Sequence, residues 1–149
     1  MKRLVLALSV VAMSATAGLA VDDPIASRKA LMQSNGAAAA VAGGMMKQQL
    51  EYNPVVAKSV IATLNATSHA FGAFFPDGSD MGSNTTASPK IWEDMGGFEA
   101  AVAKFETDTA AAMEAAGRDG PADLAAFQAA IGPILGNCKS CHEAYRVQN

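Results

Sequence analysis

The sequence predicts an all-α protein, folded as an antiparallel four-helix bundle. Alanine, the strongest helix former, is the commonest of the 149 residues. Four prolines each open an apolar-periodic run, and no stretch of strand length alternates between apolar and polar residues. With 50% apolar residues, the chain can build one hydrophobic core but is short for two domains.

The expected helix starts share one signature, a residue that can cap a helix followed directly by proline. Proline is tolerated at the first helical position because its missing N–H would have no helical partner there. A preceding Asp, Asn or Ser can accept a hydrogen bond from an amide of the first turn. The four pairs are Asp23-Pro24, Asn53-Pro54, Ser88-Pro89 and Gly120-Pro121. The helices that they predict lie near residues 24–49, 54–71, 89–116 and 121–147.

The links between these helices are of unequal length. Residues 76–88 are rich in Gly, Ser, Asn and Asp, which predicts one longer loop. The other two links are short, so the helices that they join run antiparallel. Gly117 marks the end of the third helix, and Gly96-Gly97 is its weakest point because glycine is a poor helix former.

Residues 1–20 have the pattern of a secretory signal peptide. A positive start at Lys2-Arg3 precedes an apolar run too short to span a bilayer, and small residues follow up to Ala20. We expect cleavage after Ala20, with Ala17 as the other candidate site; a retained membrane-anchoring helix is the alternative. Cleavage leaves residues 21–149 as one domain with 9 basic and 14 acidic residues, a net charge of −5.

Export predicts a periplasmic protein in a bacterium, without a membrane anchor once the signal peptide is removed. The complete chain is weakly acidic, with a formal net charge of −3, and has no basic cluster. Nucleic acid and anionic membrane surfaces are therefore poor candidates as partners.

The most specific motif is C-x-x-C-H at residues 138–142, the attachment signal of c-type haem. On a helix, positions i, i+3 and i+4 project from one face. The thiols of Cys138 and Cys141 can then bond the two haem vinyl groups, while the imidazole of His142 reaches the iron. Export agrees with this interpretation, because bacterial c-type haem is attached outside the cytoplasm.

Three other interpretations of the two cysteines are possible. A thioredoxin-type pair would lie at a helix start after a strand, but this pair lies late in the last helix. A zinc site would need further ligands, and His69 is the only other histidine. A disulfide between Cys138 and Cys141 would strain a continuous helix. His69 itself is expected to be an ordinary residue near the end of the second helix.

The second axial position of the iron decides the function. A thioether ligand suits electron transfer, whereas an apolar residue leaves the iron open to small gases. Met32 is the best candidate, because it lies one turn after Arg28 and small residues follow it on a similar face. Spacing alone leaves open that Met32 is a core methionine, since methionine commonly fills gaps. The small residues are Gly36, Ala39, Ala40 and Gly43.

These features resemble the class II c-type cytochromes, the cytochrome c′ family of four-helix bundles. The resemblance covers nearly all of the mature chain, and the C-terminal position of the haem motif is what distinguishes this class. It rests on residues 28–36, 74–78, 89–92 and 138–146.

The resemblance also implies roles for single residues. Met32 is similar to the iron ligand of the low-spin cytochrome c-556 branch, where cytochrome c′ proper has leucine or phenylalanine. Arg28 is similar to the arginine that hydrogen-bonds a haem propionate, and otherwise it is a solvated charge. Arg146 resembles the arginine near the proximal face, or it complements the C-terminus of its helix. Trp92 is expected against the haem or in the core, and many members of the family are homodimers.

The sequence and the resemblance together predict a periplasmic one-electron carrier with one covalent haem c, ligated by His142 and Met32. Its partners would be other redox proteins, and it would transform no substrate. The alternative is a five-coordinate protein that binds nitric oxide or carbon monoxide. A haem peroxidase would need a distal acid–base residue, which His69 is poorly placed to supply.

Overall fold

The structure is a computed structural model, and it describes residues 23–82 and 84–147. The predicted signal peptide lies outside the described residues. Four long helices account for most of the fold, with one short helix before the third long one. The elements are α1 (Pro24–Met46), α2 (Pro54–Phe71), the 3-10 turn η1 (Gly72–Phe74), α3 (Lys90–Glu93), α4 (Met95–Ala116) and α5 (Leu124–Tyr145).

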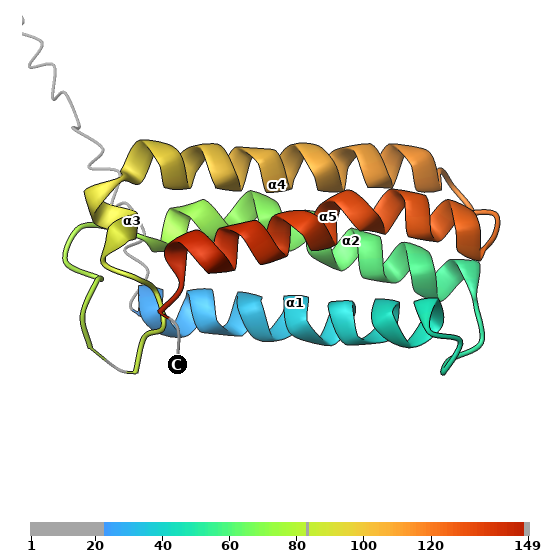
Figure 1. Ribbon diagram of the computed structural model, residues 1–149, viewed down its shortest axis with the longest axis horizontal. Coiled ribbons are helices and arrows are strands. Elements are labelled where there is room, and N and C mark those ends of the chain that lie inside the picture. The colour runs from blue at the N-terminus through green and yellow to red at the C-terminus, as the bar shows by residue number, and fades with distance from the viewer. Residues whose placement is uncertain (1–22, 83, 148–149) are drawn as a thin grey trace, which may run out of the picture.

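The four long helices lie side by side and alternate in direction, which confirms the predicted bundle (Figure 1). We call one end of the bundle the turn end, where residues 47–53 and 117–123 link the helices. The other is the loop end, where residues 75–89 connect α2 and η1 to α3. The start of α1 and the end of α5 also lie at the loop end (Figure 1).

Two of the predicted helix starts are confirmed in detail. The Asp23 carboxylate accepts a hydrogen bond of 2.8 Å from the amide of Ala26, and Pro24 opens α1. Asn53 caps α2 in the same manner, at 2.9 Å from the amide of Val55. Both caps satisfy amides that lack a partner within the helix, so the sequence fixes where these helices begin.

The prediction of one continuous helix over residues 89–116 is wrong, because the helix is interrupted at Asp94. The backbone of Asp94 leaves the helical region (φ −133°), and its carboxylate accepts a hydrogen bond of 3.1 Å from the amide of Gly97. A short acidic side chain that bonds a nearby amide competes with helix continuation. A Cβ atom at Gly97 would meet the Asp94 carboxylate and the Tyr145 hydroxyl, so any larger residue here would have to displace these two side-chain ends.

The last helix begins at Leu124 rather than at residue 121. Asp123 is its cap, accepting a hydrogen bond of 2.8 Å from the amide of Ala126. Gly120 has φ +94°, which glycine adopts without strain, and its Cα packs closely against the carbonyl of Pro54. This contact with the start of α2 makes residues 120–122 part of the link between the helices.

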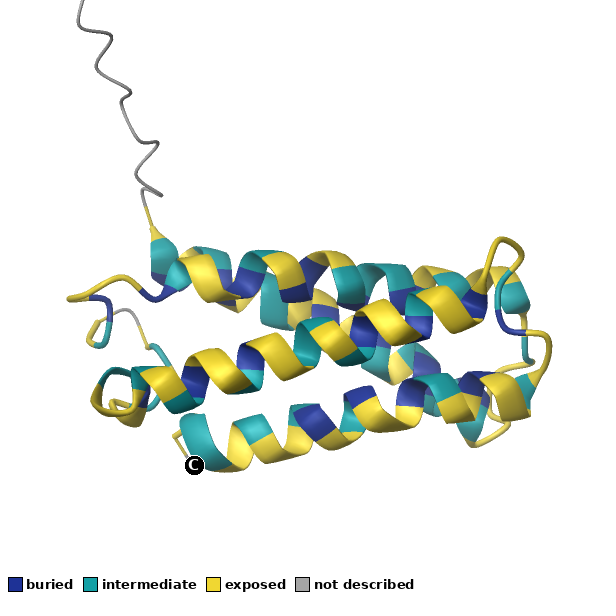
Figure 2. Cartoon of the chain, turned by 90° about the horizontal axis from the view of Figure 1, so that it is seen from above, coloured by how far each residue is buried: buried dark blue, intermediate teal, exposed yellow. Residues whose placement is uncertain are grey.

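The hydrophobic core has two parts, one at each end. Buried positions recur along each helix at helical spacing, on the side that faces its neighbours (Figure 2). The turn-end core is mostly aliphatic, and its larger members are Met45, Val60, Ile61, Leu64, Phe127, Ile131 and Ile134. The loop-end core is mostly aromatic and consists of Phe71, Phe75, Ile91, Phe98 and Val102.

Buried polar side chains separate the two cores. In α2 and α4 they lie between residues of the two cores, and in α1 and α5 they lie between turn-end core residues and residues that pack against the loop-end core, Met32 and Tyr145. Hydrogen bonds join four of them across helices: Asn35 of α1 with Thr67 of α2, and Ser68 of α2 with Thr109 of α4 at 3.0 Å. We call this set the polar layer; its members are Asn35, Thr67, Ser68, Thr109 and Asn137.

Candidate haem-binding site

A cavity of about 460 Å³ lies between α1 and α5 on the loop-end side of the polar layer. Aromatic rings of the loop-end core form one wall, among them Phe71 and Phe98. Asn35 and Asn137 of the polar layer lie at its inner end. The cavity is of the size at which proteins commonly hold a small ligand or cofactor.

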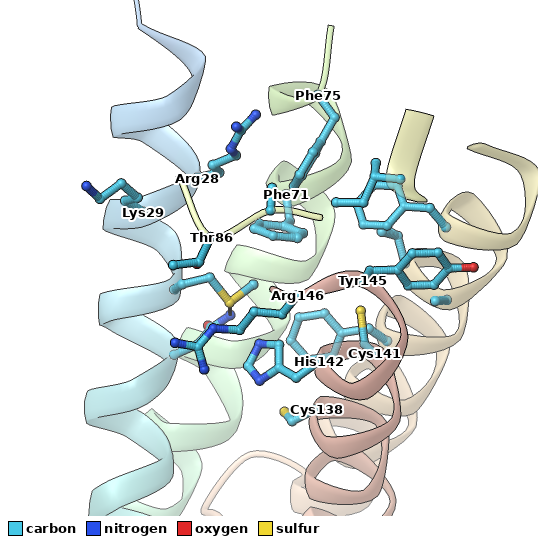
Figure 3. A pocket seen from close by; sticks show the side chains of 18 of the residues that line it. Arg28, Lys29, Phe71, Phe75, Thr86, Cys138, Cys141, His142, Tyr145 and Arg146 are labelled. Atoms are coloured by element: carbon cyan, nitrogen blue, oxygen red, sulfur yellow. Dashed lines mark hydrogen bonds between the residues drawn. The ribbon is translucent and has the colours of Figure 1, made fainter. Parts of the chain in front are cut away.

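The C-x-x-C-H motif lies on the α5 wall of this cavity. Cys138, Cys141 and His142 all line it, as their helical spacing requires (Figure 3). The two cysteines are free thiols and half-buried, whereas His142 is exposed at the mouth. Two thiols and an imidazole on one face of one helix therefore border the same cavity.

The electrostatics of the two thiols do not match a thioredoxin-type redox pair, and those of His142 favour a neutral imidazole. Burial raises the pKa of Cys138 and of Cys141, whereas a thioredoxin-type cysteine has a lowered pKa. Desolvation, and then the positive charge of Arg146, lower the pKa of His142. Both effects favour the neutral imidazole, which is the form that binds iron.

The rest of the lining fits haem, a flat apolar ring that carries two carboxylates. Three cationic residues line the cavity, Arg28, Lys29 and Arg146, and no described Asp or Glu does. Guanidinium and ammonium groups complement carboxylates, so the charge of the lining matches the propionates. The side-chain amide nitrogen of Asn137 is buried without a hydrogen-bond partner among the described residues. Such an orphan donor is typical of a site that a further group completes.

Arg28 lines the cavity, and its guanidinium also anchors the loop that closes the loop end. Only 4% exposed, it donates to the carbonyls of Phe74 (3.2 Å) and Ser79 (2.6 Å). The hydroxyls of Ser79 and Thr85 accept two more hydrogen bonds, at 3.1 and 2.9 Å. Arg28 is therefore not a solvated charge, and its contact with a propionate stays a prediction.

The other predicted site residues lie at different distances from the cavity. Met32 lines it from α1. Arg146 lines it from the end of α5 (Figure 3). Trp92 does not line the cavity. The centre of its ring lies 6.0 Å from the centre of the Phe75 ring and 5.6 Å from the guanidinium carbon of Arg28. Trp92 thus packs against the loop-end core, close to one of its two predicted positions.

Other metal chemistry finds no support in these residues. Among residues 23–82 and 84–147, no three His, Cys, Asp or Glu side chains gather closely enough to hold a metal ion. His69 is exposed near the end of α2, 4.0 Å from the carboxylate of Glu106, and does not line the cavity. It is therefore not placed to act as a distal acid–base group.

Comparison with known proteins identifies the family. Residues 23–146 match the Cytochrome C′ family, so the match spans every helix described above. The chain belongs to the cytochrome c′ family. Its relatives carry both names that the sequence suggests: a cytochrome c′ of Rhodopseudomonas palustris is 36% identical over 85% of this chain and 83% of its own. A cytochrome c-556 of Agrobacterium tumefaciens is 35% identical over 81% of this chain and 92% of its own.

Solved structures of the family have the same bundle. Cytochrome c′ from Rhodopseudomonas palustris superposes with a TM-score of 0.78 at 35% identity, over 85% of this chain and 98% of the other. The oxidised cytochrome c556 of that organism gives 0.73 at 25% identity, with the same coverage. Members of this family bind haem c covalently, and the protein is a haem protein of the cytochrome c′ and c-556 group.

Sequence reasoning missed several polar residues of the cavity, among them Lys29, Asn35 and Asn137. Lys29 adds a positive charge beside Arg28, and Asn35 and Asn137 place carboxamides at the inner end. The two asparagines could have been noticed in the sequence, because asparagine destabilises the interior of an alanine-rich helix unless its side chain makes a specific interaction. Which way each asparagine faces depends on how the helices pack, and a single sequence does not show that.

Proposed function

We propose that this protein is a one-electron carrier whose haem c is attached through Cys138 and Cys141, with His142 and Met32 as axial ligands. The observation that supports this most is the position of Met32. Its side chain lies on the α1 wall of the cavity, while His142 lies on the α5 wall. A methionine opposite a histidine is the ligand pair of electron-transfer haems.

The bound haem iron supplies a one-electron couple between the ferric and ferrous states. The protein's own residues do the rest. Aromatic rings of the loop-end core exclude water from one wall, and Arg28, Lys29 and Arg146 balance the propionate charge. Ligands held by two packed helices keep their geometry in both oxidation states, which favours fast electron exchange.

Optical spectra with and without carbon monoxide test the ligand set. Wild-type protein is expected to be low-spin in both oxidation states and slow to bind carbon monoxide. Met32→Ala removes the second ligand and should give a high-spin haem that binds carbon monoxide quickly. Met113→Ala is the matched control, because Met113 is also partly buried but packs against the turn-end core. An unchanged spectrum in Met32→Ala would exclude Met32 as the ligand.

The second candidate is a gas-binding protein with a five-coordinate iron. It is favoured by the relative named cytochrome c′, which at 36% identity is as similar as the relative named c-556. In that case the wild-type protein is itself high-spin and binds carbon monoxide at once. The same spectra therefore separate the two functions.

We also propose that residues 1–20 direct export and that the partners are other periplasmic redox proteins; a homodimer stays a prediction. None of the described helices is long and apolar enough to cross a membrane. Protein for the spectra should be taken from the periplasm, where mass spectrometry will show whether the chain begins at Val21. A full-length chain retained in the membrane fraction would contradict cleavage and support the retained membrane-anchoring helix, and haem-free protein found in the cytoplasm would contradict export.

A further inference from the structure

Asn35 lies one helical turn after Met32, at the inner end of the cavity. Its side chain is 8% exposed, and its amide nitrogen lies 4.0 Å from the sulfur of Met32. A thioether sulfur is a weak hydrogen-bond acceptor with long donor distances, so this contact is a hydrogen bond from the amide to sulfur.

A second helix fixes the orientation of this amide. Thr67 on α2 is a buried residue, 7% exposed, and its hydroxyl donates to the side-chain oxygen of Asn35. With its oxygen toward Thr67, the carboxamide turns its NH₂ group toward Met32. The three side chains therefore form a row from α2 through Asn35 to the sulfur on the cavity wall.

We propose that Asn35 is a positioning residue whose hydrogen bond to the Met32 thioether raises the reduction potential of the iron. This inference rests on the proposed function, because it requires Met32 as a ligand. The sulfur has two lone pairs: one can bind iron while the other accepts the N–H of Asn35. A hydrogen bond withdraws electron density from a ligand, and the ferric state depends on that density more than the ferrous state.

A purely structural role for Asn35 predicts a different result. Asn35 and Thr67 join α1 to α2, so replacing either one should lower the melting temperature in any case. A leucine at position 35 also makes the surroundings of the iron less polar, which on its own disfavours the charged ferric state and raises the potential. Loss of the hydrogen bond lowers the potential instead. The sign of the shift therefore distinguishes the two roles.

The test uses the holoprotein and three single variants. Asn35→Leu removes the donor, and the Thr67 hydroxyl keeps an acceptor in the carbonyl of Leu64, at 3.0 Å. Thr67→Val keeps the donor but lets the amide rotate. Ser68→Ala is the matched control, since Ser68 is 0% exposed in the same polar layer, bonds Thr109 at 3.0 Å and does not line the cavity.

Each protein is equilibrated with a redox dye, and its ferrous-to-ferric ratio is measured at one fixed dye potential. Asn35→Leu should lower this ratio about two- to fivefold, the effect of one modest hydrogen bond. Thr67→Val should lower it less, and Ser68→Ala should leave it unchanged. The sulfur-to-iron charge-transfer absorption of the ferric protein should shift in Asn35→Leu and not in Ser68→Ala.

The outcomes separate failure of this inference from failure of the proposed function. A wild-type protein without the sulfur charge-transfer band overturns both, because Met32 is then no ligand. A wild-type protein with the band, together with an unchanged or higher ratio in Asn35→Leu, overturns only the role of Asn35. If Asn35→Leu does not fold, an unchanged ratio in Thr67→Val has the same meaning.

Discussion

The two ends of the bundle are stabilised in different ways. At the turn end the core is closed and mostly aliphatic; Ile61, Phe127 and Ile131 are each 0% exposed. At the loop end the core is aromatic and borders a cavity of about 460 Å³. The polar layer lies between them. One end completes its packing with side chains alone, whereas the other uses its rings to wall a space for a further group.

This difference shows how one small bundle serves two needs. Aliphatic side chains of varied shape fill space densely, which stabilises the fold without further partners. Aromatic rings instead offer flat surfaces to a flat cofactor. They also pack against each other: the centre of the Phe98 ring lies 4.6 Å from that of Phe75 and 5.5 Å from that of Tyr145, both in edge-to-face contact. The loop-end core therefore leaves space for a bound group, and the closed turn-end core contributes packing that does not depend on that group.

The largest expected effect comes from preventing haem attachment with Cys138→Ala/Cys141→Ala. The loop end should lose protection against hydrogen exchange, while the turn end keeps most of its own. The amides of Phe98 and Phe127 are matched reporters, because each donates a hydrogen bond of 3.0 Å to the carbonyl oxygen of the N-cap residue of its helix. We expect protection of the Phe98 amide to fall by about a hundredfold more than that of Phe127. Equal losses at both amides would show that the two ends unfold as one unit.

The next effect concerns how each end holds its links. Arg28 ties the loop end with four hydrogen bonds, whereas at the turn end the Tyr52 hydroxyl donates one, to the carbonyl of Pro121. Arg28→Lys keeps the charge but not the planar fork, so it should cost about 2 to 3 kcal/mol of unfolding free energy, against about 1 for Tyr52→Phe. Denaturant unfolding measures both.

The burial of Arg28 also contributes to the loss of stability expected for Arg28→Lys. Desolvation lowers the pKa of Arg28, and the negative charges of Asp23 and Asp80 oppose that shift. The lysine variant keeps the desolvation cost while losing hydrogen bonds. Faster amide exchange at Ser79 and Thr85 should accompany the loss of stability. A variant with normal exchange at these two residues would show that the loop is held by other contacts.

The parts of this fold that could be predicted are those that depend on neighbours in sequence. Asp23 and Asn53 cap helices through amides two or three residues away, and both were identified from the sequence. The haem motif likewise needs only the spacing of one helix. The sequence predicts the start of α5 three residues too early, because two possible caps, Gly120 and Asp123, lie close together. The contact of Gly120 with Pro54, distant in sequence, decides between them.

The site could be predicted only in part for the same reason. Cys138, His142 and Met32 follow from motif and resemblance, and the structure brings all three to one cavity. The partners of Arg28 lie 46 to 57 residues away, and Thr67 lies 32 residues from Asn35. Such pairs depend on how each helix is rotated about its axis, which the apolar pattern of an alanine-rich helix specifies weakly.

The smallest expected effect compares two caps of the same kind. Asp94 and Asp123 each accept a hydrogen bond from an amide three residues on, at 3.1 and 2.8 Å. Replacing either aspartate by alanine should cost about 1 kcal/mol. Only Asp94 also accepts a hydrogen bond from the cavity-lining Tyr145, at 3.1 Å. The two variants should therefore differ little in stability and differ clearly at the loop end.

Tyrosine titration shows that difference. Burial, and after it the hydrogen bond and negative charge of Asp94, raise the pKa of Tyr145. A raised pKa keeps the phenol neutral to higher pH, so Asp94→Ala should let Tyr145 ionise at lower pH, whereas Asp123→Ala leaves it unchanged. Tyrosinate absorbance should be measured in a Tyr52→Phe background, because the negative charge of Asp123 helps to raise the pKa of Tyr52, the only other tyrosine of the chain. Identical titrations in the two variants would mean that the Asp94 contact does not govern Tyr145, and that the two caps differ only in position.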